Sequence, residues 1–96
     1  MSAIGAIATL RVQPGKEAEF EKIFAELVVA VNANESGNSY YKLFRTAETG
    51  VYKVLECYDD EAAIETHRAS DHFRTIGARL GPCLAGAPEV ERLPAV

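Results

Sequence analysis

Several features that mark other classes of protein are scarce or missing in this sequence. Its two cysteines, Cys57 and Cys83, make neither a disulfide framework nor a metal-binding spacing, so we expect a reducing, cytoplasmic environment. The net charge is −4 and there is no basic cluster, which argues against nucleic acid as a partner. No apolar run approaches the ~18 residues of a transmembrane helix, and the first residues lack a signal peptide's basic and apolar regions, so we expect no membrane partner.

What is present is typical of one small soluble domain. The 96 residues are 48% hydrophobic and 25% charged, which is too apolar for disorder. We therefore predict a single domain over residues 1–96. A chain of this length buries only a thin core, so self-association is an easy way to bury more surface.

The hydrophobic pattern changes period along the chain. Alternating apolar positions predict a strand within residues 3–13, and a period of 3.6 predicts a helix from Lys16 onward. The stripe of that helix consists of Phe20, Ile23, Phe24, Leu27, Val28 and Val31. By composition, residues 32–38 read as a loop. Residues 39–46 and 51–58 then alternate around a turn at 47–50, which predicts a β-hairpin.

The C-terminal part predicts two short helices and a last strand. Asp59 and Asp60 are N-cap candidates for a helix over 61–68, and Ser70 is one for a helix over 71–80. Residues 88–94 are long enough for an edge strand. The order βαββααβ predicts an α+β, ferredoxin-like split βαβ fold with helices on one face of an antiparallel sheet. Because the open face carries aromatic residues, we expect two copies to pair through it as a homodimer.

Two histidines are the candidate catalytic residues. His67 follows Ile64 by three positions and so shares its inward face. Histidine as a type titrates near neutrality, so His67 suits a general base, although a structural histidine bonded to a backbone carbonyl fits the same pattern. His72 begins the second short helix and could line a cavity mouth, lie in solvent or fix the helix corner. The two are five residues apart across a helix break, so we expect no metal site.

Several residues of the sheet and helices are candidates for substrate binding. Glu56 lies on an otherwise apolar strand face and needs a partner, for which Arg45 on the neighbouring strand is the candidate. The pair could be structural, or Glu56 could be a catalytic acid. The remaining candidates are aromatic side chains that could stack on a flat ring or belong to the core, and a threonine that could point into a cavity: Tyr41, Tyr58, Phe73 and Thr9.

Several stretches resemble the antibiotic biosynthesis monooxygenase (ABM) family. Residues 12–20 (VQPGKEAEF) are similar to the family's V-x-P-G-K-E-x-x-F entry to its first helix. Residues 56–64 resemble its E-x-W-x-D-E-A-A-L segment, and residues 67–73 its H-x-x-S-x-H-F. Gly37 with residues 41–45 resembles the second strand, and residues 80–88 the closing segment. The similarity spans about residues 4–94, and its specific part is the second-helix segment.

The resemblance implies a dimeric α+β barrel with a small-molecule cavity in each subunit. Relatives include cofactor-free monooxygenases that oxidise hydroquinones or polyketide phenols, haem-degrading enzymes, isomerases and binding proteins. Tyr58 stands where the family has Trp, and the chain has no Trp at all. The haem-degrading branch of the family relies on an Asn on the first strand, together with a Trp and a His. Residues 1–13 contain no Asn, which argues against that branch.

These observations favour a cofactor-independent monooxygenase that oxidises a small electron-rich phenol or hydroquinone with O2. In that reading His67 takes the phenolic proton, Tyr41, Tyr58 and Phe73 hold the ring, and His72 or Arg45 lies near the oxyanion. Two alternatives stay open: a dimeric binding module without turnover, and an isomerase of a small metabolite. An RNA-binding domain of the same fold is excluded because residues 51–58 lack its basic, glycine-containing aromatic motif.

Overall fold

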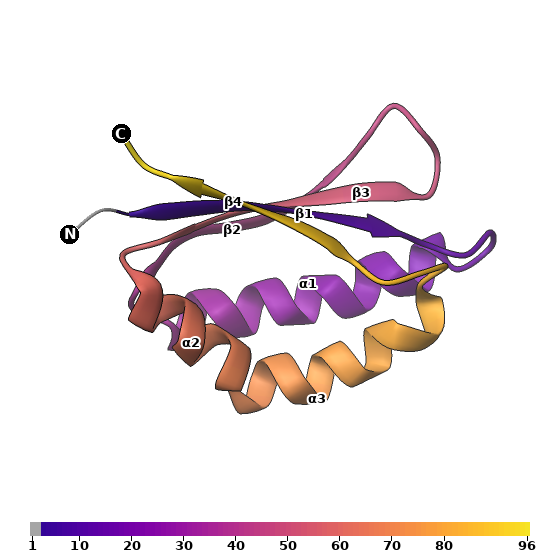
Figure 1. Ribbon diagram of the computed structural model, residues 1–96. Helices are drawn as coiled ribbons and strands as arrows, with labels where there is room; N and C mark the ends of the chain where they lie inside the picture. Colours follow the sequence, from indigo (N-terminus) through magenta and orange to yellow (C-terminus); the bar gives the residue numbers. More distant parts are fainter. Residues whose placement is uncertain (1–2) are drawn as a thin grey trace.

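The computed structural model describes residues 3–96. The prediction that the first residues form no signal peptide falls partly on Met1 and Ser2, which lie outside the described residues. The elements in chain order are β1 (Ile4–Arg11), α1 (Glu17–Asn34), β2 (Asn38–Arg45), β3 (Val51–Tyr58), α2 (Glu61–Ala69), α3 (Asp71–Leu80), a 3-10 turn (Gly81–Cys83) and β4 (Glu89–Pro94). The strands form an antiparallel sheet in the order β2-β3-β1-β4. All three helices lie beneath one face of it (Figure 1), which confirms the predicted α+β, ferredoxin-like βαββααβ fold.

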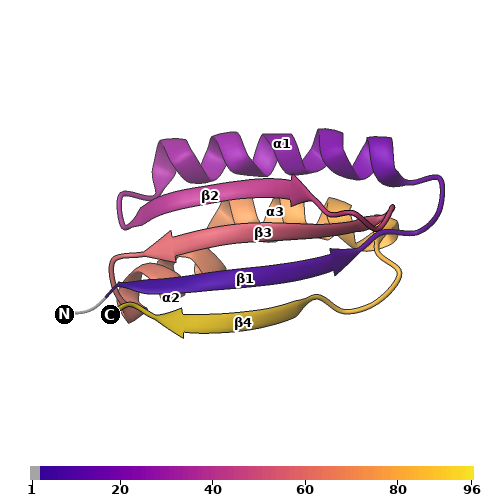
Figure 2. The same ribbon diagram turned by 90° about the horizontal axis from the view of Figure 1, so that it is seen from above.

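The strand register leaves a shallow depression along β1, on the face of the sheet that the helices cover. Ala6 on β1 lies between Glu56 of β3 and Arg92 of β4, and the next row places Ala8 between Val54 and Val90. These residues are on the side of the sheet that the helices cover. Because alanine ends at Cβ, β1 leaves space that its neighbours on either side do not fill. Figure 2 shows β1 running along the sheet between β3 and β4.

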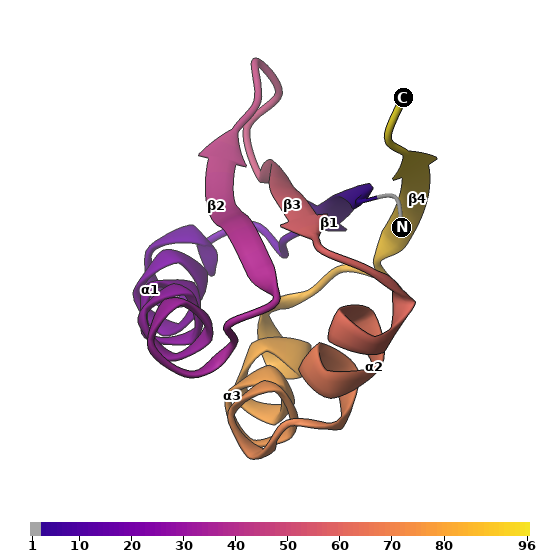
Figure 3. The same ribbon diagram turned by 90° about the vertical axis from the view of Figure 1, so that its left-hand side faces the viewer.

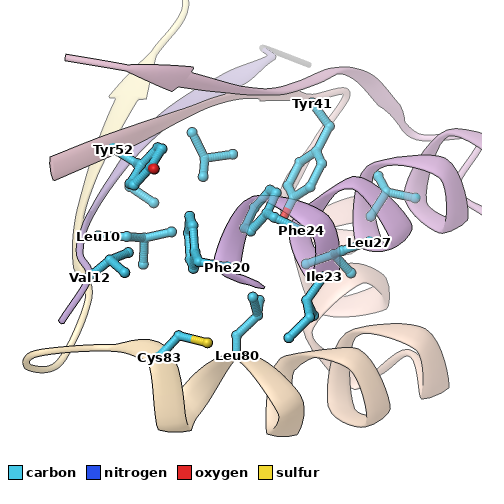
Figure 4. Close-up of a cluster of buried hydrophobic side chains, with 13 residues drawn as sticks. Leu10, Val12, Phe20, Ile23, Phe24, Leu27, Tyr41, Tyr52, Leu80 and Cys83 are labelled. Carbon is cyan, nitrogen blue, oxygen red and sulfur yellow. The ribbon is translucent and has the colours of Figure 1, made fainter. Parts of the chain in front are cut away.

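The main core lies between α1 and the sheet. The predicted stripe is confirmed: Phe20, Phe24, Leu27 and Val31 are buried, and Phe20 packs on Tyr52 with ring centroids 4.8 Å apart. Figure 4 shows this cluster. Burial of the α1 stripe against β2 and β3 holds that edge of the molecule together. Helix α3 lies between α1 and α2, and α2 lies towards the β1 and β4 side (Figure 3).

The predicted loop over residues 32–38 is wrong in extent. Helix α1 continues to Asn34, whose side-chain amide donates to the carbonyl oxygen of Ala30 at 2.8 Å, and β2 begins at Asn38. Only residues 35–37 form the turn. A Cβ at Gly37 would lie 2.7 Å from the Cβ of Ala63, so only glycine lets this turn approach α2 so closely. The close approach brings the turn against the helix that carries His67.

Capping side chains fix the corner between α2 and α3. Asp60 accepts a hydrogen bond from the Ala63 amide at 2.9 Å, and Ser70 accepts one from the Phe73 amide at 3.2 Å, so both predicted N-caps are confirmed. The Ser70 hydroxyl also donates to the carbonyl oxygen of His67 at 2.7 Å. Ser70 therefore links the end of α2, at His67, to the start of α3.

The other face of the sheet has no helix over it (Figure 1). Tyr40 and Phe44 of β2 and Leu93 of β4 are exposed. Among residues 3–96, no helix combines the length and the apolar character that crossing a membrane requires.

Candidate active site

A cavity of about 580 Å³ lies between the helix-covered face of the sheet and the three helices. Ala6 and Ala8 form part of its lining, where the register leaves space beside β1. Most of the rest is apolar, including Phe24, Leu27 and Phe73. Its polar lining is confined to six side chains: Tyr41, Glu56, Tyr58, His67, Arg68 and Arg92.

His67 projects from α2 into an aromatic enclosure. The residue is only 4% exposed, and its ring centroid lies 5.2 Å from that of Tyr41, 5.5 Å from Tyr58 and 4.6 Å from Phe73. Ring nitrogen Nδ1 faces Glu35, whereas Nε2 has no hydrogen-bond partner within residues 3–96. The predicted inward orientation of His67 is confirmed, and its partner is a carboxylate instead of a backbone carbonyl.

Glu35 joins both histidines and is the residue that sequence reasoning missed. Its carboxylate is buried, with both oxygens 3.0 Å from His67 Nδ1 and Oε2 2.5 Å from His72 Nε2. A carboxylate accepts hydrogen bonds, so this geometry suits ring nitrogens that donate to Glu35. In such a tautomer of His67, Nε2 is the nitrogen with the free electron pair. A signal for Glu35 existed: it follows Val31 by four residues and so continues the inward stripe of α1.

Glu56 and Tyr58 form a second polar pair in the cavity wall. They project from the same face of β3, and the Tyr58 hydroxyl donates to the Glu56 carboxylate. Burial raises the pKa of Glu56, against the opposing effects of the Tyr58 hydrogen bond and of His67. Burial also raises the pKa values of the Tyr58 and Tyr41 hydroxyls, so both phenols stay neutral near pH 7 and Tyr58 keeps the hydrogen that it donates to Glu56.

Three predicted site residues lie elsewhere. Arg45 pairs with Glu21 of α1 at 2.8 Å and is largely exposed, so the predicted Arg45–Glu56 pair is wrong. Thr9 is on the open face of the sheet, where the Lys53 ammonium donates to its hydroxyl at 3.3 Å, because its neighbours Ala8 and Leu10 take the inward positions. His72 does not line the cavity; it reaches Glu35 from α3 and stands behind His67.

Arg68 and Arg92 are cavity residues that the sequence interpretation also missed. Arg68 is exposed and polar, so its pattern is that of a solvent-facing residue, and Arg92 gains its place only through the pairing of β4 with β1. The place of Arg92 cannot be inferred without the strand register, whereas Arg68 follows Ile64 by four residues and so shares its side of the helix. As for metals, no group of three or more His, Cys, Asp or Glu side chains in residues 3–96 is placed to hold an ion.

Fold and cavity together define a ferredoxin-like α+β domain with an aromatic pocket that ends on a histidine–carboxylate cluster. The family profile described as "Antibiotic biosynthesis monooxygenase" matches residues 3–79. The chain belongs to this ABM family, as the sequence motifs predict.

Known relatives agree with the family assignment. The chain is 37% identical over 82 residues, 84% of each chain, to "Putative monooxygenase YcnE" of Bacillus subtilis (strain 168). It is 51% identical to a "putative antibiotic biosynthesis monooxygenase" from Caulobacter crescentus CB15, with a TM-score of 0.96 over 99% of this chain and 91% of that one. A conserved protein from Methanosarcina mazei Go1 matches with a TM-score of 0.90 and 29% identity, over 97% and 92% of the two chains.

Proposed function

We propose that this protein is a cofactor-independent monooxygenase that oxidises a small electron-rich phenol or hydroquinone with O2. The observation that carries the proposal is His67: one ring nitrogen is held by a buried carboxylate, and the ring lines an aromatic cavity with its other nitrogen unpartnered within residues 3–96. A base so placed can take a proton from a ring hydroxyl. Family membership and the similarity to proteins described as monooxygenases support the reaction class.

Glu35 supports this role through its position. Its buried carboxylate holds the Nδ1 side of the His67 ring, which leaves Nε2 for a substrate. The carboxylate thus orients the imidazole as the aspartate does in a serine-hydrolase triad.

The oxidation itself draws its electrons from the substrate. For a phenol with an unsubstituted carbon ortho or para to the hydroxyl, His67 takes the hydroxyl proton and the phenolate passes one electron to O2. The two radicals join at that carbon to form a peroxide, which takes the proton back from His67. His67 then removes the C–H proton of the same carbon while the O–O bond breaks, and the departing hydroxide takes this proton from His67 to leave as water. One phenol and one O2 give one quinone and one water.

The cavity lining supplies binding and the exclusion of water. Tyr41, Tyr58 and Phe73 surround the His67 ring, so a flat substrate that reaches Nε2 meets their faces and edges. The apolar walls remove the solvent shell from the phenolate and so promote electron transfer. His72 acts as a positioning residue, because it contacts Glu35 and not the cavity.

We also propose that two copies pair as a homodimer through the open face of the sheet. Tyr40, Phe44 and Leu93 are exposed on this face, and the edge strand β4 is exposed along its whole length. Pairing would cover these apolar groups at little entropic cost per residue, because the strands are already ordered. Sedimentation equilibrium of the wild type and of a Phe44→Glu, Leu93→Glu variant tests it: a dimer that becomes a monomer is expected, and a monomeric wild type contradicts it.

The reaction is tested by oxygen uptake from a panel of hydroquinones and naphthols with metal-stripped protein. The informative variant is His67→Asn, whose amide can still donate towards Glu35 while Nε2 is removed. Thr9→Ala, on the open face, is the matched control. We expect uptake with wild type and Thr9→Ala, incorporation of one atom of labelled O2 into the quinone, and loss of both with His67→Asn. No uptake with any compound from folded wild type contradicts the proposal, and binding without turnover then identifies a binding module.

A further inference from the structure

We propose that the ligand of this cavity is a hydroxylated aromatic carboxylate, bound with its hydroxyl towards His67 and its carboxylate on Arg68. The inference rests on the proposed function for the position of the hydroxyl. It adds the substrate class and the residue that selects it.

Arg68 stands on the inner side of α2. Ile64, His67 and Arg68 occupy positions i, i+3 and i+4 of the helix, so all three project to one side, and all three line the cavity. Ile64 and His67 are buried, whereas Arg68 is exposed, which puts the guanidinium at the rim. The lining of the cavity therefore reaches solvent at Arg68.

Arg68 differs from the other arginines in having no carboxylate partner. The described residues contain six arginines, and five of them form ion pairs: Arg11 with Glu89, Arg45 with Glu21, Arg74 with Asp71, Arg79 with Glu26 and Arg92 with Glu61. Arg68 makes no such pair within residues 3–96. The chain has a net charge of −4, and two arginines, Arg68 and Arg92, line the cavity. Of these two, Arg68 is the one without a carboxylate partner among residues 3–96.

Arg92 is the other arginine of the lining, and its charge is already balanced. Its guanidinium lies 2.9 Å from the Glu61 carboxylate, so the pair links β4 to α2 on that side of the cavity. Glu61 is not itself among the lining residues. The uncompensated positive charge at the rim is therefore that of Arg68.

The acidic groups of the site fix the direction of the ligand. Glu56 lies in the wall and Glu35 behind His67, so an anionic group at the inner end would face two carboxyl groups. A ring hydroxyl at that end can instead donate to His67 or Glu56. A ring with a hydroxyl at one end and a carboxylate at the other suits a cavity of this polarity, with acidic groups at its inner end and the unpaired Arg68 at its rim.

The test compares para-hydroxybenzoate with its neutral analogue para-hydroxybenzamide, titrated without oxygen and followed by NMR. We expect wild type to bind the carboxylate about tenfold more tightly, because a charge-assisted hydrogen bond to a guanidinium is stronger than a neutral one. Arg68→Gln should remove this preference. The matched control Arg74→Gln, on α3 and outside the cavity lining, should keep it.

Equal binding of the two compounds by wild type overturns the inference, and so does a preference that survives in Arg68→Gln. These outcomes are separate from failure of the proposed reaction, because binding is measured without turnover. A preference for the carboxylate with no oxygen uptake contradicts only the monooxygenase proposal. Uptake from neutral phenols without a carboxylate preference contradicts only the role of Arg68.

Discussion

Replacing Glu35 with alanine is the perturbation that bears most directly on the histidine cluster. The substitution leaves two ring N–H groups, on His67 and His72, without the acceptor that lies 3.0 and 2.5 Å away. A buried donor left unsatisfied costs about 1–3 kcal/mol, and His72 can turn towards solvent more easily than His67, so we expect a loss of about 3 kcal/mol. With an unfolding entropy of roughly 0.2 kcal/mol per kelvin for 96 residues, the melting temperature falls by about 15 °C.

The control is Glu26→Ala on α1, the helix that Glu35 directly follows. Glu26 also accepts two hydrogen bonds, from Arg79 at 2.8 and 3.0 Å, but both partners are exposed, so solvent screens the pair and the loss is small. Calorimetric melting of both variants provides the assay. Glu35→Gln should melt between the two, because an amide accepts from one histidine and presents a donor to the other. Equal shifts for Glu35→Ala and Glu26→Ala would refute the reasoning that Glu35 is a buried anchor.

Three further predictions follow from packing and charge. Gly37→Ala should cost about 1–3 kcal/mol in wild type by overlapping Ala63, and much less when added to Ala63→Gly; equal costs in denaturant titrations would contradict the contact. Gly77→Ala, in α3 with open space at its Cβ, should add about 0.5–1 kcal/mol and raise the melting temperature by roughly 4 °C; a lower one would contradict this. Because burial raises the pKa of Glu56, the folded state binds its proton more tightly than the unfolded state does. The free energy of unfolding should therefore fall as pH rises from the ordinary glutamate range through the raised pKa, and Glu56→Gln should flatten that fall in pH-dependent denaturation.

The elements of the fold could be predicted because local patterns determine them. The apolar stripe of α1 and the capping side chains of Asp60 and Ser70 act within a few residues of chain, and all three are confirmed. The turn before β2 was misjudged because its composition, rich in Asn, Ser and Gly, outweighed the inward position of Glu35. Burial of a polar residue at the end of a helix depends on partners from α2 and α3, which a local pattern does not contain.

The site was predicted in part for the same reason. The inward position of His67 follows from helix spacing alone. The partner of Glu56 depends on strand register: its cross-strand neighbour on β2 is Tyr41, whereas Arg45 is four residues further along, opposite Tyr52. That offset is about 13 Å along a strand, too far for the predicted ion pair. The prediction that Thr9 points into the cavity is wrong because side chains alternate along a strand. Ala8 and Leu10 face the helices, so Thr9 between them faces the opposite side of the sheet.

The central claim is that His67 accepts a proton from a phenol bound in the cavity, and para-nitrophenol makes that step visible because its ionised form absorbs in the visible region. The measurement is a titration of the wild type and of His67→Asn with this compound, at a pH where the free phenol is mostly neutral. We expect the phenolate band to appear on binding to wild type and the bound phenol to stay neutral in His67→Asn. A phenol that binds wild type without ionising, or that ionises equally in both proteins, would contradict the account.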